Sequence, residues 1–136
     1  PKAPFMSPWG INTNRWIQIT ATEAEMIKYA SNVHYARKVN FANVLFGLAE
    51  KLGANYENVR LAMAADFRIG DSHLDVSRGG YRGFGGHCLP KDMEALIAVL
   101  RAQGLENEAF LLREDYGFNE KLLKEQGLTW EDVRLK

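Results

Sequence analysis

The sequence predicts a mainly α-helical fold, a helical domain built on one long central helix of about 30 residues with three or so shorter helices and a glycine-rich loop. Three observations predict it. Residues 20–52 contain no proline and only one glycine, Gly47, before the stop at Gly53. Three later segments combine apolar helical spacing with a cap or a glycine stop. The length of 136 residues, 46% of them hydrophobic, suits one domain with a sizeable core.

The chain begins with an irregular lead-in over residues 1–19. Prolines, asparagines and a glycine interrupt residues 1–15, and such residues favour turns over regular structure. The stretch "RWIQIT" is a weak candidate for a short strand, because six residues decide little. We therefore expect the helical domain to occupy residues 20–136.

The long helix has clear signals at both ends. Thr20 precedes Glu23 by three positions and Thr22 precedes Glu25 by three, so either pair suits a capping box. Gly53 supplies a left-handed stop. A helix of about 30 residues is about 45 Å long, and apolar residues occur on most of its sides. We expect this helix to pack against its own domain on one side and against a second copy of the chain on another.

A shorter helix is predicted in "ANYENVRLAMAAD". Asn55 is its candidate cap, and Val59, Ala62 and Met63 are expected to face inward. Residues 67–87, which are rich in glycine and interrupted by arginines, are predicted to form a loop.

Two further helices and a final turn complete the predicted domain. The segment "LPKDMEALIAVLRAQG" has Pro90 in its first turn, where the missing N–H costs nothing, and Gly104 at its end. The segment "NEAFLLREDYGFNEKLLKEQG" predicts a fourth helix with a candidate bend at Gly117. The tail "LTWEDVRLK" adds a turn.

Composition excludes several classes of function. Lysine plus arginine and aspartate plus glutamate both number 17, so the net charge is zero and favours neither a nucleic acid nor an anionic membrane as partner. No run of 18 apolar residues is present, which predicts no membrane span. The single cysteine cannot form an internal disulfide, so we expect a reducing, cytoplasmic location.

That cysteine, Cys88, stands between a glycine-rich stretch and the helix that starts around Pro90. Unpaired N–H groups at a helix start favour a thiolate, and Lys91 acts in the same direction while Asp92 opposes it. Glycines allow the backbone to approach a ligand closely. A reactive thiol facing a substrate and a buried structural cysteine both remain open, and local chemistry favours the first. The glycines are Gly79, Gly80, Gly83, Gly85 and Gly86.

A second polar pair lies in the long helix. Lys28 and Asn32 are four positions apart and share one face, where they could stabilise an alkoxide. The alternative is an ordinary solvated lysine beside an asparagine. The histidines His34, His73 and His87 have no metal-ligand spacing to the cysteine, so no metal site is predicted.

Three motifs in this sequence resemble those of a known family. "GFGGHCLPKD" resembles the active-site segment of the nucleotide-sugar dehydrogenases, the UDP-glucose/GDP-mannose dehydrogenase family. "ATEAEMIKYASN" resembles the start of that family's long central helix, and "AADFRIG" resembles the segment between the two. The motifs occur in the family's order, and the resemblance covers roughly residues 17–120.

The resemblance implies an NAD-dependent oxidation of a sugar C6 alcohol to a carboxylate through two hydride transfers. Cys88 corresponds to the nucleophile that captures the aldehyde as a thiohemiacetal. Lys28 corresponds to the lysine that stabilises the oxyanion, and Asn32 to its partner. Asp92 corresponds to the acid thought to assist proton transfer.

The resemblance also implies contacts with substrate, cofactor and a second subunit. Arg68 corresponds to an arginine that reaches the nucleotide-sugar substrate of the neighbouring subunit in some members. Phe84, Gly85 and Gly86 would contact the sugar, and Lys91 would lie near the NAD cofactor. These roles imply a homodimer formed through the long helix.

The family has a dinucleotide-binding domain before this region and a nucleotide-sugar-binding domain after it. Neither is found in these 136 residues, so we expect an isolated central dimerisation domain that is inactive alone. Residues 1–19 are expected to be a remnant of, or a linker from, the missing dinucleotide-binding domain. The alternative is a non-catalytic helical dimerisation module derived from the family. UDP-glucose, GDP-mannose and N-acetylated sugars all remain open as substrates.

Overall fold

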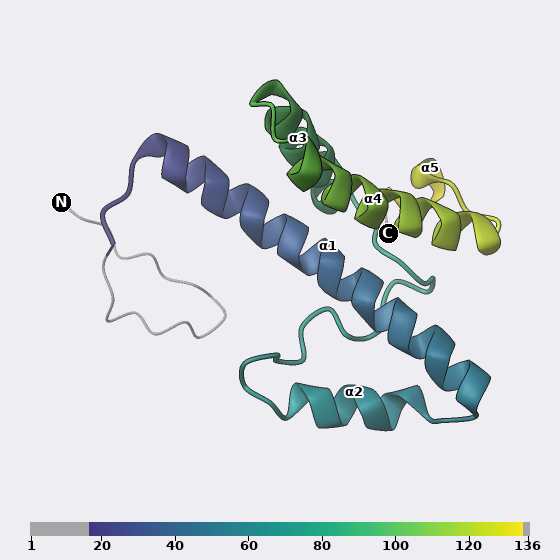
Figure 1. Ribbon diagram of the computed structural model, residues 1–136. Helices are drawn as coiled ribbons and strands as arrows, with labels where there is room; N and C mark the ends of the chain where they lie inside the picture. Colours follow the sequence, from purple (N-terminus) through teal and green to yellow (C-terminus); the bar gives the residue numbers. More distant parts are fainter. Residues whose placement is uncertain (1–16, 135–136) are drawn as a thin grey trace.

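The structure is a computed structural model that describes residues 17–134. Within this range the fold is helical and contains no strand, which confirms the predicted class. Its helices are α1 (Ala21–Leu52), α2 (Tyr56–Ala64), α3 (Cys88–Ala102), α4 (Glu106–Glu125) and α5 (Trp130–Val133) (Figure 1).

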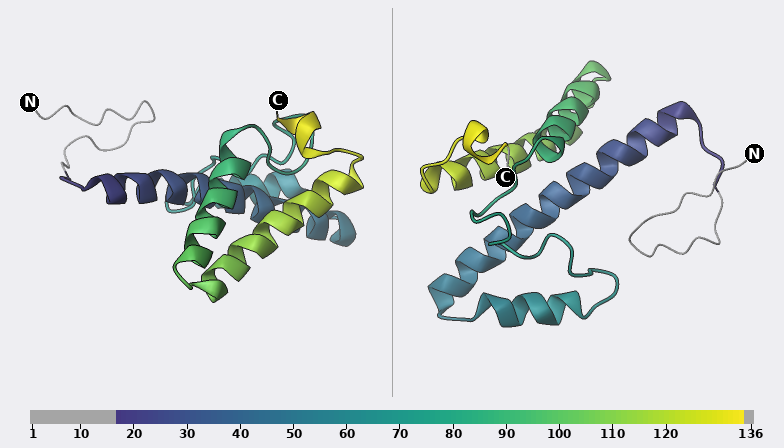
Figure 2. Two further views of the ribbon diagram at one scale, coloured as in Figure 1. Left: turned by 90° about the horizontal axis from the view of Figure 1, so that it is seen from above. Right: turned by 180° about the vertical axis from the view of Figure 1, so that it is seen from behind.

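The long helix α1 crosses the whole molecule, and the other helices pack around its C-terminal two thirds. In Figure 1, α2 folds back along one side of α1 and α4 lies along another, while α3 runs behind α4. The two views of Figure 2 show that α3 and α4 form an open hairpin and that the N-terminal turns of α1 project beyond it. Helix α3 packs against both α1 and α4, whereas α2 packs against α1.

The ends of α1 agree with the sequence prediction. Of the two candidate capping boxes, Thr20 and Glu23 form theirs: the Glu23 N–H donates to Thr20 Oγ1 at 3.2 Å, and the Thr20 N–H donates to Glu23 Oε2 at 2.6 Å. Gly53 ends the helix at φ 67°, in the left-handed region. The strand considered for "RWIQIT" is wrong where it can be checked, because residues 17–20 have no regular structure and residues 15–16 lie outside the described range.

Helices α3 and α4 also begin and end close to the predicted positions. Pro90 occupies the first turn of α3, and Gly104 follows that helix at φ 74°. Helix α4 continues through Gly117 as one element, so the considered bend does not break it. Thr129 caps the short α5 that the tail was expected to add.

The predicted inward face of α2 is wrong. Val59 and Ala62 are exposed and Met63 is half-buried, whereas Tyr56 is buried at the start of the helix. The Tyr56 ring packs edge-on against Phe46, and its hydroxyl donates to the Leu74 carbonyl at 2.7 Å. Helix α2 has only 9 residues and packs against α1 and the segment after α2, and Tyr56 is its one buried residue.

Two hydrophobic clusters form the core. The first joins α1, α3 and α4, and the second joins α1, α2 and the segment after α2. The first contains Val33, Ala36, Phe84, Met93, Ile97, Ala109 and Leu112. The second contains Ala42, Ala49, Tyr56, Leu74 and Val76. Among the described residues, no helix is both long enough and apolar enough to span a bilayer.

Candidate active site

The candidate site lies where the N-terminus of α3 meets the N-terminal half of α1. Cys88 is the first residue of α3 and its side chain is exposed. Asp92 follows one turn later, so both residues project toward the same side of the helix. The predicted position of the thiol at a helix start is therefore confirmed, and the thiol is open to a ligand.

Asp92 connects the two helices. The Asn32 amide on α1 donates to Asp92 Oδ2 at 2.5 Å, and the Lys91 ammonium donates to Asp92 Oδ1 at 2.7 Å. The Asp92 side chain is 1% exposed, whereas the Lys91 side chain is 48% exposed. Three residues that the sequence analysis selected separately thus form one hydrogen-bonded group.

The electrostatic balance keeps this group charged. Burial by itself raises the pKa of the Asp92 carboxyl, but hydrogen bonds from Lys91 and Asn32 and the positive charges of Lys91 and Lys28 hold it below its ordinary value. The hydrogen bond to Asp92 raises the pKa of Lys91, partly against desolvation. The nearby Cys88 acts in the same direction on Lys91. At neutral pH the site therefore holds a buried carboxylate and an adjacent ammonium.

Lys28 lies one turn before Asn32 on the same face of α1. Its ammonium stands 5.5 Å from the centroid of the Tyr29 ring, and its charge acts on Asp92 across the gap between α1 and α3. The residue is exposed. The structure therefore brings Lys28, Asn32, Lys91 and Asp92 together beside Cys88.

Arg68 lies elsewhere in this chain. It follows α2, and its guanidinium is paired with Asp66, with Arg68 Nε 2.9 Å from Asp66 Oδ1. Its side chain is 75% exposed and borders a groove between α1, α4 and the segment after α2. A contact between Arg68 and the substrate of another subunit stays a prediction.

The glycine-rich loop owes part of its composition to packing. A Cβ on Gly83 would lie 2.6 Å from Asn119 Oδ1, and a Cβ on Gly85 would lie 2.7 Å from the Val133 side chain. Gly86 adopts φ 71°, which disfavours a side chain there. The sequence analysis attributed these glycines to approach of a ligand. Gly83 and Gly85 instead allow the loop to lie directly against α4 and α5.

Phe84 is a core residue beneath this loop. Its side chain is 2% exposed, and its ring centroid lies 5.8 Å from that of Trp130. Its backbone N–H donates to Asn119 Oδ1 and its carbonyl accepts from Asn119 Nδ2, both at 2.8 Å. Of the three predicted sugar contacts, Gly85 and Gly86 are therefore the ones nearer the surface.

Sequence reasoning missed Asn119. This residue is 0% exposed on α4, between the buried Leu112 and Leu122 turns. The available signal was an amide within the apolar stripe of an amphipathic segment, because a buried amide needs a specific partner. Its partner, the Phe84 backbone, carries no sequence signal.

The groove beside Arg68 has a volume of about 820 Å³ and lies apart from the Asp92 group. Apolar side chains from three segments line it, among them Phe41, Val44, Ile69 and Leu111. Asn40 also lines it, and its buried Oδ1 has no hydrogen-bond partner within the described residues. An apolar groove with an unpaired amide oxygen is a candidate contact surface.

Within residues 17–134, no group of three histidine, cysteine, aspartate or glutamate side chains could hold a metal ion. For NAD, the one residue selected from sequence is Lys91. An ammonium has three donors, and Lys91 is half-exposed with Asp92 as its carboxylate partner, so it fits contact with a phosphate at the edge of the site.

Residues 22–121 match the central domain of the UDP-glucose/GDP-mannose dehydrogenase family. The chain is 41% identical over 96 residues to the UDP-glucose 6-dehydrogenase YwqF of Bacillus subtilis, which covers 71% of this chain and 20% of that protein. It is 44% identical over 85 residues to the UDP-glucose 6-dehydrogenase AglM of Haloferax volcanii, a match that covers 62% of this chain and 19% of that protein. It is 39% identical over 106 residues to a UDP-glucose 6-dehydrogenase of Pseudomonas aeruginosa, a match that covers 78% of this chain and 22% of that protein.

The chain thus spans about a fifth of the length of these curated relatives. The matched region contains all four residues of the predicted catalytic set. The chain belongs to the UDP-glucose/GDP-mannose dehydrogenase family and corresponds to its central domain.

Proposed function

We propose that this chain is the catalytic and dimerisation domain of an NAD-dependent nucleotide-sugar 6-dehydrogenase. The observation that carries the proposal is the Asn32 to Asp92 hydrogen bond, which joins α1 to α3 one turn below the exposed Cys88 thiol. The three relatives named above are UDP-glucose 6-dehydrogenases, so UDP-glucose is the first substrate to test. GDP-mannose, which the family name also includes, is the second.

In the proposed reaction Cys88 captures the C6 aldehyde. Its sulfur, as a thiolate, forms a bond to C6, and the carbonyl π electrons move to oxygen to give a thiohemiacetal oxyanion. The Lys28 ammonium and the Asn32 amide stabilise that oxyanion, because donors fixed where charge develops lower the barrier. Bound NAD serves as the acceptor for the hydride that each oxidation removes from C6.

Asp92 fixes the Asn32 amide, which acts on the oxyanion, and the Lys91 ammonium, which is assigned to the cofactor. Its carboxylate accepts from Asn32 and Lys91, so the amide and the ammonium are oriented before substrate arrives. In the last step water attacks the thioester carbon, the C–S bond breaks, and Cys88 leaves as a thiolate. Asp92, one turn after Cys88 on α3, is the carboxylate assigned to receive the proton that the water releases.

The remaining contacts come from residues at the rim of the site. Lys91 would contact the phosphates of NAD, and the backbone at Gly85 and Gly86 lies against the sugar. Phe84 is buried beneath the loop, and both of its backbone polar groups are bonded to Asn119. Arg68, far from Cys88 in its own chain, reaches the substrate bound to a second copy. Most of the NAD and nucleotide contacts come from domains other than this one.

The homodimer forms through α1. Half of a 32-residue helix stays uncovered in the single chain, and Phe41, Val44 and Leu48 on it are 54%, 49% and 53% exposed. A continuous apolar surface of this kind favours association. The groove that Phe41 and Val44 line is adjacent to Arg68, so the same contact that covers α1 brings Arg68 toward the partner.

The test uses the complete enzyme that contains this domain, supplied with NAD and either UDP-glucose or its 6-aldehyde. Cys88→Ser is expected to abolish aldehyde oxidation, whereas the conservative surface change Lys121→Arg retains it. The chain without an NAD-binding domain is expected to be inactive. Normal aldehyde oxidation by Cys88→Ser would leave the dimerisation module, which needs no thiol, as the better account.

A further inference from the structure

Two amide side chains, one within α4 and one at its C-cap, hold the glycine-rich loop. Asn119 and Gln126 are seven positions apart, which is two helical turns, so both face the loop. The Gln126 side chain accepts from the Arg82 N–H at 2.7 Å and donates to the Arg82 carbonyl at 2.8 Å. Asn119 makes the same pair of bonds to Phe84, both at 2.8 Å. Each amide thus satisfies both backbone polar groups of one loop residue, as a neighbouring strand does in a sheet.

A third contact continues the series toward the thiol. The Gly86 N–H donates to the Val133 carbonyl at 2.9 Å, so Arg82, Phe84 and Gly86 are all held from the side of α4 and α5. Cys88 follows two residues later as the first residue of α3. Every second residue of the loop is therefore hydrogen-bonded up to Gly86, two positions before the cysteine.

The contact between Asn119 and Phe84 is the most deeply buried of the three. Asn119 is 0% exposed and its partner Phe84 is 2% exposed, so water cannot replace either bond. Gln126 and Arg82 are half-buried, and water has access to their bonds. The packing at Gly83, where a Cβ would lie 2.6 Å from Asn119 Oδ1, shows how closely the loop lies against this amide.

We propose that Asn119 is a positioning residue for Cys88. By fixing both backbone polar groups of Phe84, it holds the loop in the one conformation that places the thiol opposite Asn32 and Lys28. The inference rests on the proposed function, because it assigns Asn119 a role in the step that uses the Cys88 sulfur. It predicts that loss of the Asn119 bonds slows capture of the aldehyde more than any step that does not involve sulfur.

The first experiment measures amide hydrogen exchange in the 136-residue chain. Asn119→Ala is expected to speed exchange of the Phe84 and Gly86 amides about 10-fold or more, because both bonds to Phe84 are lost. Asn119→Asp still accepts from the Phe84 N–H but cannot donate to its carbonyl, so the effect is smaller. Leu123→Ala is the matched control. It removes a buried neighbour, 1% exposed, from the same helix and leaves the loop bonds in place.

The second experiment separates the two oxidations in the complete enzyme. A misplacement of about 1 Å at a reacting group can cost about 100-fold in rate. Asn119→Ala is therefore expected to lower kcat for the supplied 6-aldehyde by about 10- to 100-fold while alcohol oxidation to the aldehyde stays near the parent rate. Asn119→Asp restores part of the loss. Leu123→Ala, which has a structural effect only, lowers both oxidations by the same factor.

Each outcome has one meaning. Unchanged hydrogen exchange of the Phe84 amide in Asn119→Ala would show that the Asn119 bonds do not hold the loop. Equal losses in the alcohol and aldehyde oxidations of Asn119→Ala would overturn the positioning role. Retained aldehyde oxidation by Cys88→Ser would instead overturn the proposed function. The exchange measurement would still test whether Asn119 holds the Phe84 backbone. Faster exchange together with a selective loss of aldehyde oxidation supports the inference.

Discussion

Asp92 carries its charge inside the protein because two helices supply donors to it. Asn32 comes from α1 and Lys91 from α3 itself, and each bonds a different carboxylate oxygen. Lys91 is half-exposed, so water would replace part of its bond. The Asn32 bond is the one that ties α1 to the start of α3.

The lowered pKa of Asp92 predicts acid sensitivity. Its folded-state pKa lies below the unfolded value, so its contribution to stability is fully present above the unfolded pKa, near 4, and is lost as pH falls through the folded value. In Asp92→Asn this contribution is absent. We therefore expect the free energy of unfolding, measured with urea between pH 6 and about pH 2, to fall less steeply with acid in the variant.

The control for this measurement is Asp75→Asn. The Ser77 backbone and side chain lower the pKa of Asp75 as well, but this exposed residue lies away from α3. Asp75→Asn should change the pH dependence of the free energy of unfolding less than Asp92→Asn does. Parallel acid curves for the parent chain and Asp92→Asn would show that the carboxylate contributes nothing specific to the fold.

The sequence was sufficient to select Cys88, Lys28, Asn32 and Asp92, since motif order and helical spacing place them on defined faces. It was not sufficient for Asn119 or for the environment of Phe84. The partner of Asn119 is a backbone 35 positions away, and no side-chain pattern encodes a backbone group. Ligand approach at the glycines at 83 and 85 stays a prediction. Their packing against α4 and α5 could not be predicted, because those neighbours become known only from the fold.

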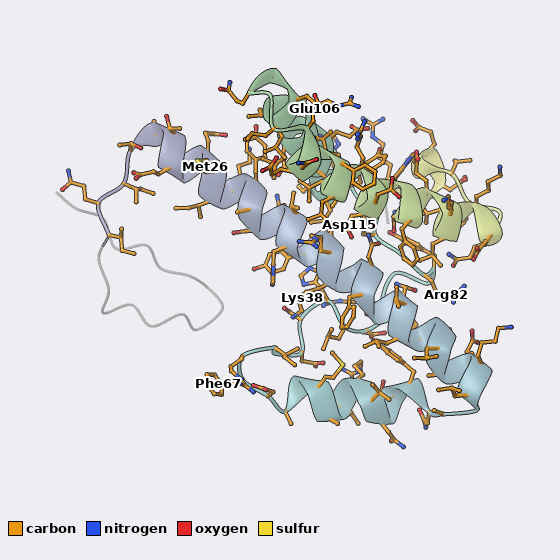
Figure 3. The ribbon with its side chains drawn as sticks, viewed as in Figure 1. Met26, Lys38, Phe67, Arg82, Glu106 and Asp115 are labelled. Atoms are coloured by element: carbon orange, nitrogen blue, oxygen red, sulfur yellow. The ribbon has the colours of Figure 1, made fainter. Side chains whose placement is uncertain are left out.

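At the scale of elements, polar contacts from α1 reach the segment after α2 on one side and α4 on the other. The Lys38 ammonium donates to the carbonyls of Ile69 and Gly70 at 2.9 and 3.3 Å, which ties the segment after α2 to α1. On the other side, Arg37 Nε lies 2.8 Å from Asp115 Oδ2 on α4. Figure 3 shows Lys38 and Asp115 on different sides of α1.

Lys38→Met is expected to loosen the segment between α2 and Leu74. Methionine keeps the length of the side chain but removes the donors, so the carbonyls of Ile69 and Gly70 turn to water. Hydrogen exchange should increase over residues 67–73 and stay unchanged in α4. Lys51→Met, an exposed lysine in the last turn of the same helix, is the control and should leave that exchange unchanged. Equal exchange in both variants would contradict the assigned role of Lys38.

Element boundaries were predictable where the signal is local. The Thr20 capping box, the Gly53 stop and the Pro90 first turn depend on a few neighbouring residues, and each was found as expected. The burial of α2 depends instead on which neighbour covers it. Val59 and Ala62 follow a helical pattern but have no helix above them in the single chain.

At the scale of the whole molecule, α1 is longer than the structure that surrounds it. Its 32 residues extend about 48 Å, and its N-terminal turns project past α3 and α4 in both views of Figure 2. Met26 and Ile27 there are 64% and 53% exposed. We propose that these turns and the groove around Phe41 are covered by other parts of the assembled enzyme, the groove by a second copy of the chain.

Phe41→Glu tests the dimer. A charge placed in an apolar interface without a partner is expected to weaken association, because an isolated charge loses its hydration when it is buried. Sedimentation equilibrium should give a dimer for the parent chain and a shift toward monomer for the variant. Val99→Glu is the control, because Val99 is 51% exposed on α3 outside the groove. A parent chain that stays monomeric at high concentration would contradict dimerisation through α1.

The most direct test of the central claim is to look for the sugar on the sulfur. The complete enzyme is mixed with NAD and the nucleotide sugar, quenched in acid during turnover, and analysed by peptide mass spectrometry. The account predicts the acyl group of the nucleotide sugar on the Cys88 sulfur, in the peptide that contains this residue, and no such adduct in Cys88→Ser. An adduct on another residue, or an unmodified Cys88 peptide while product accumulates, would contradict it.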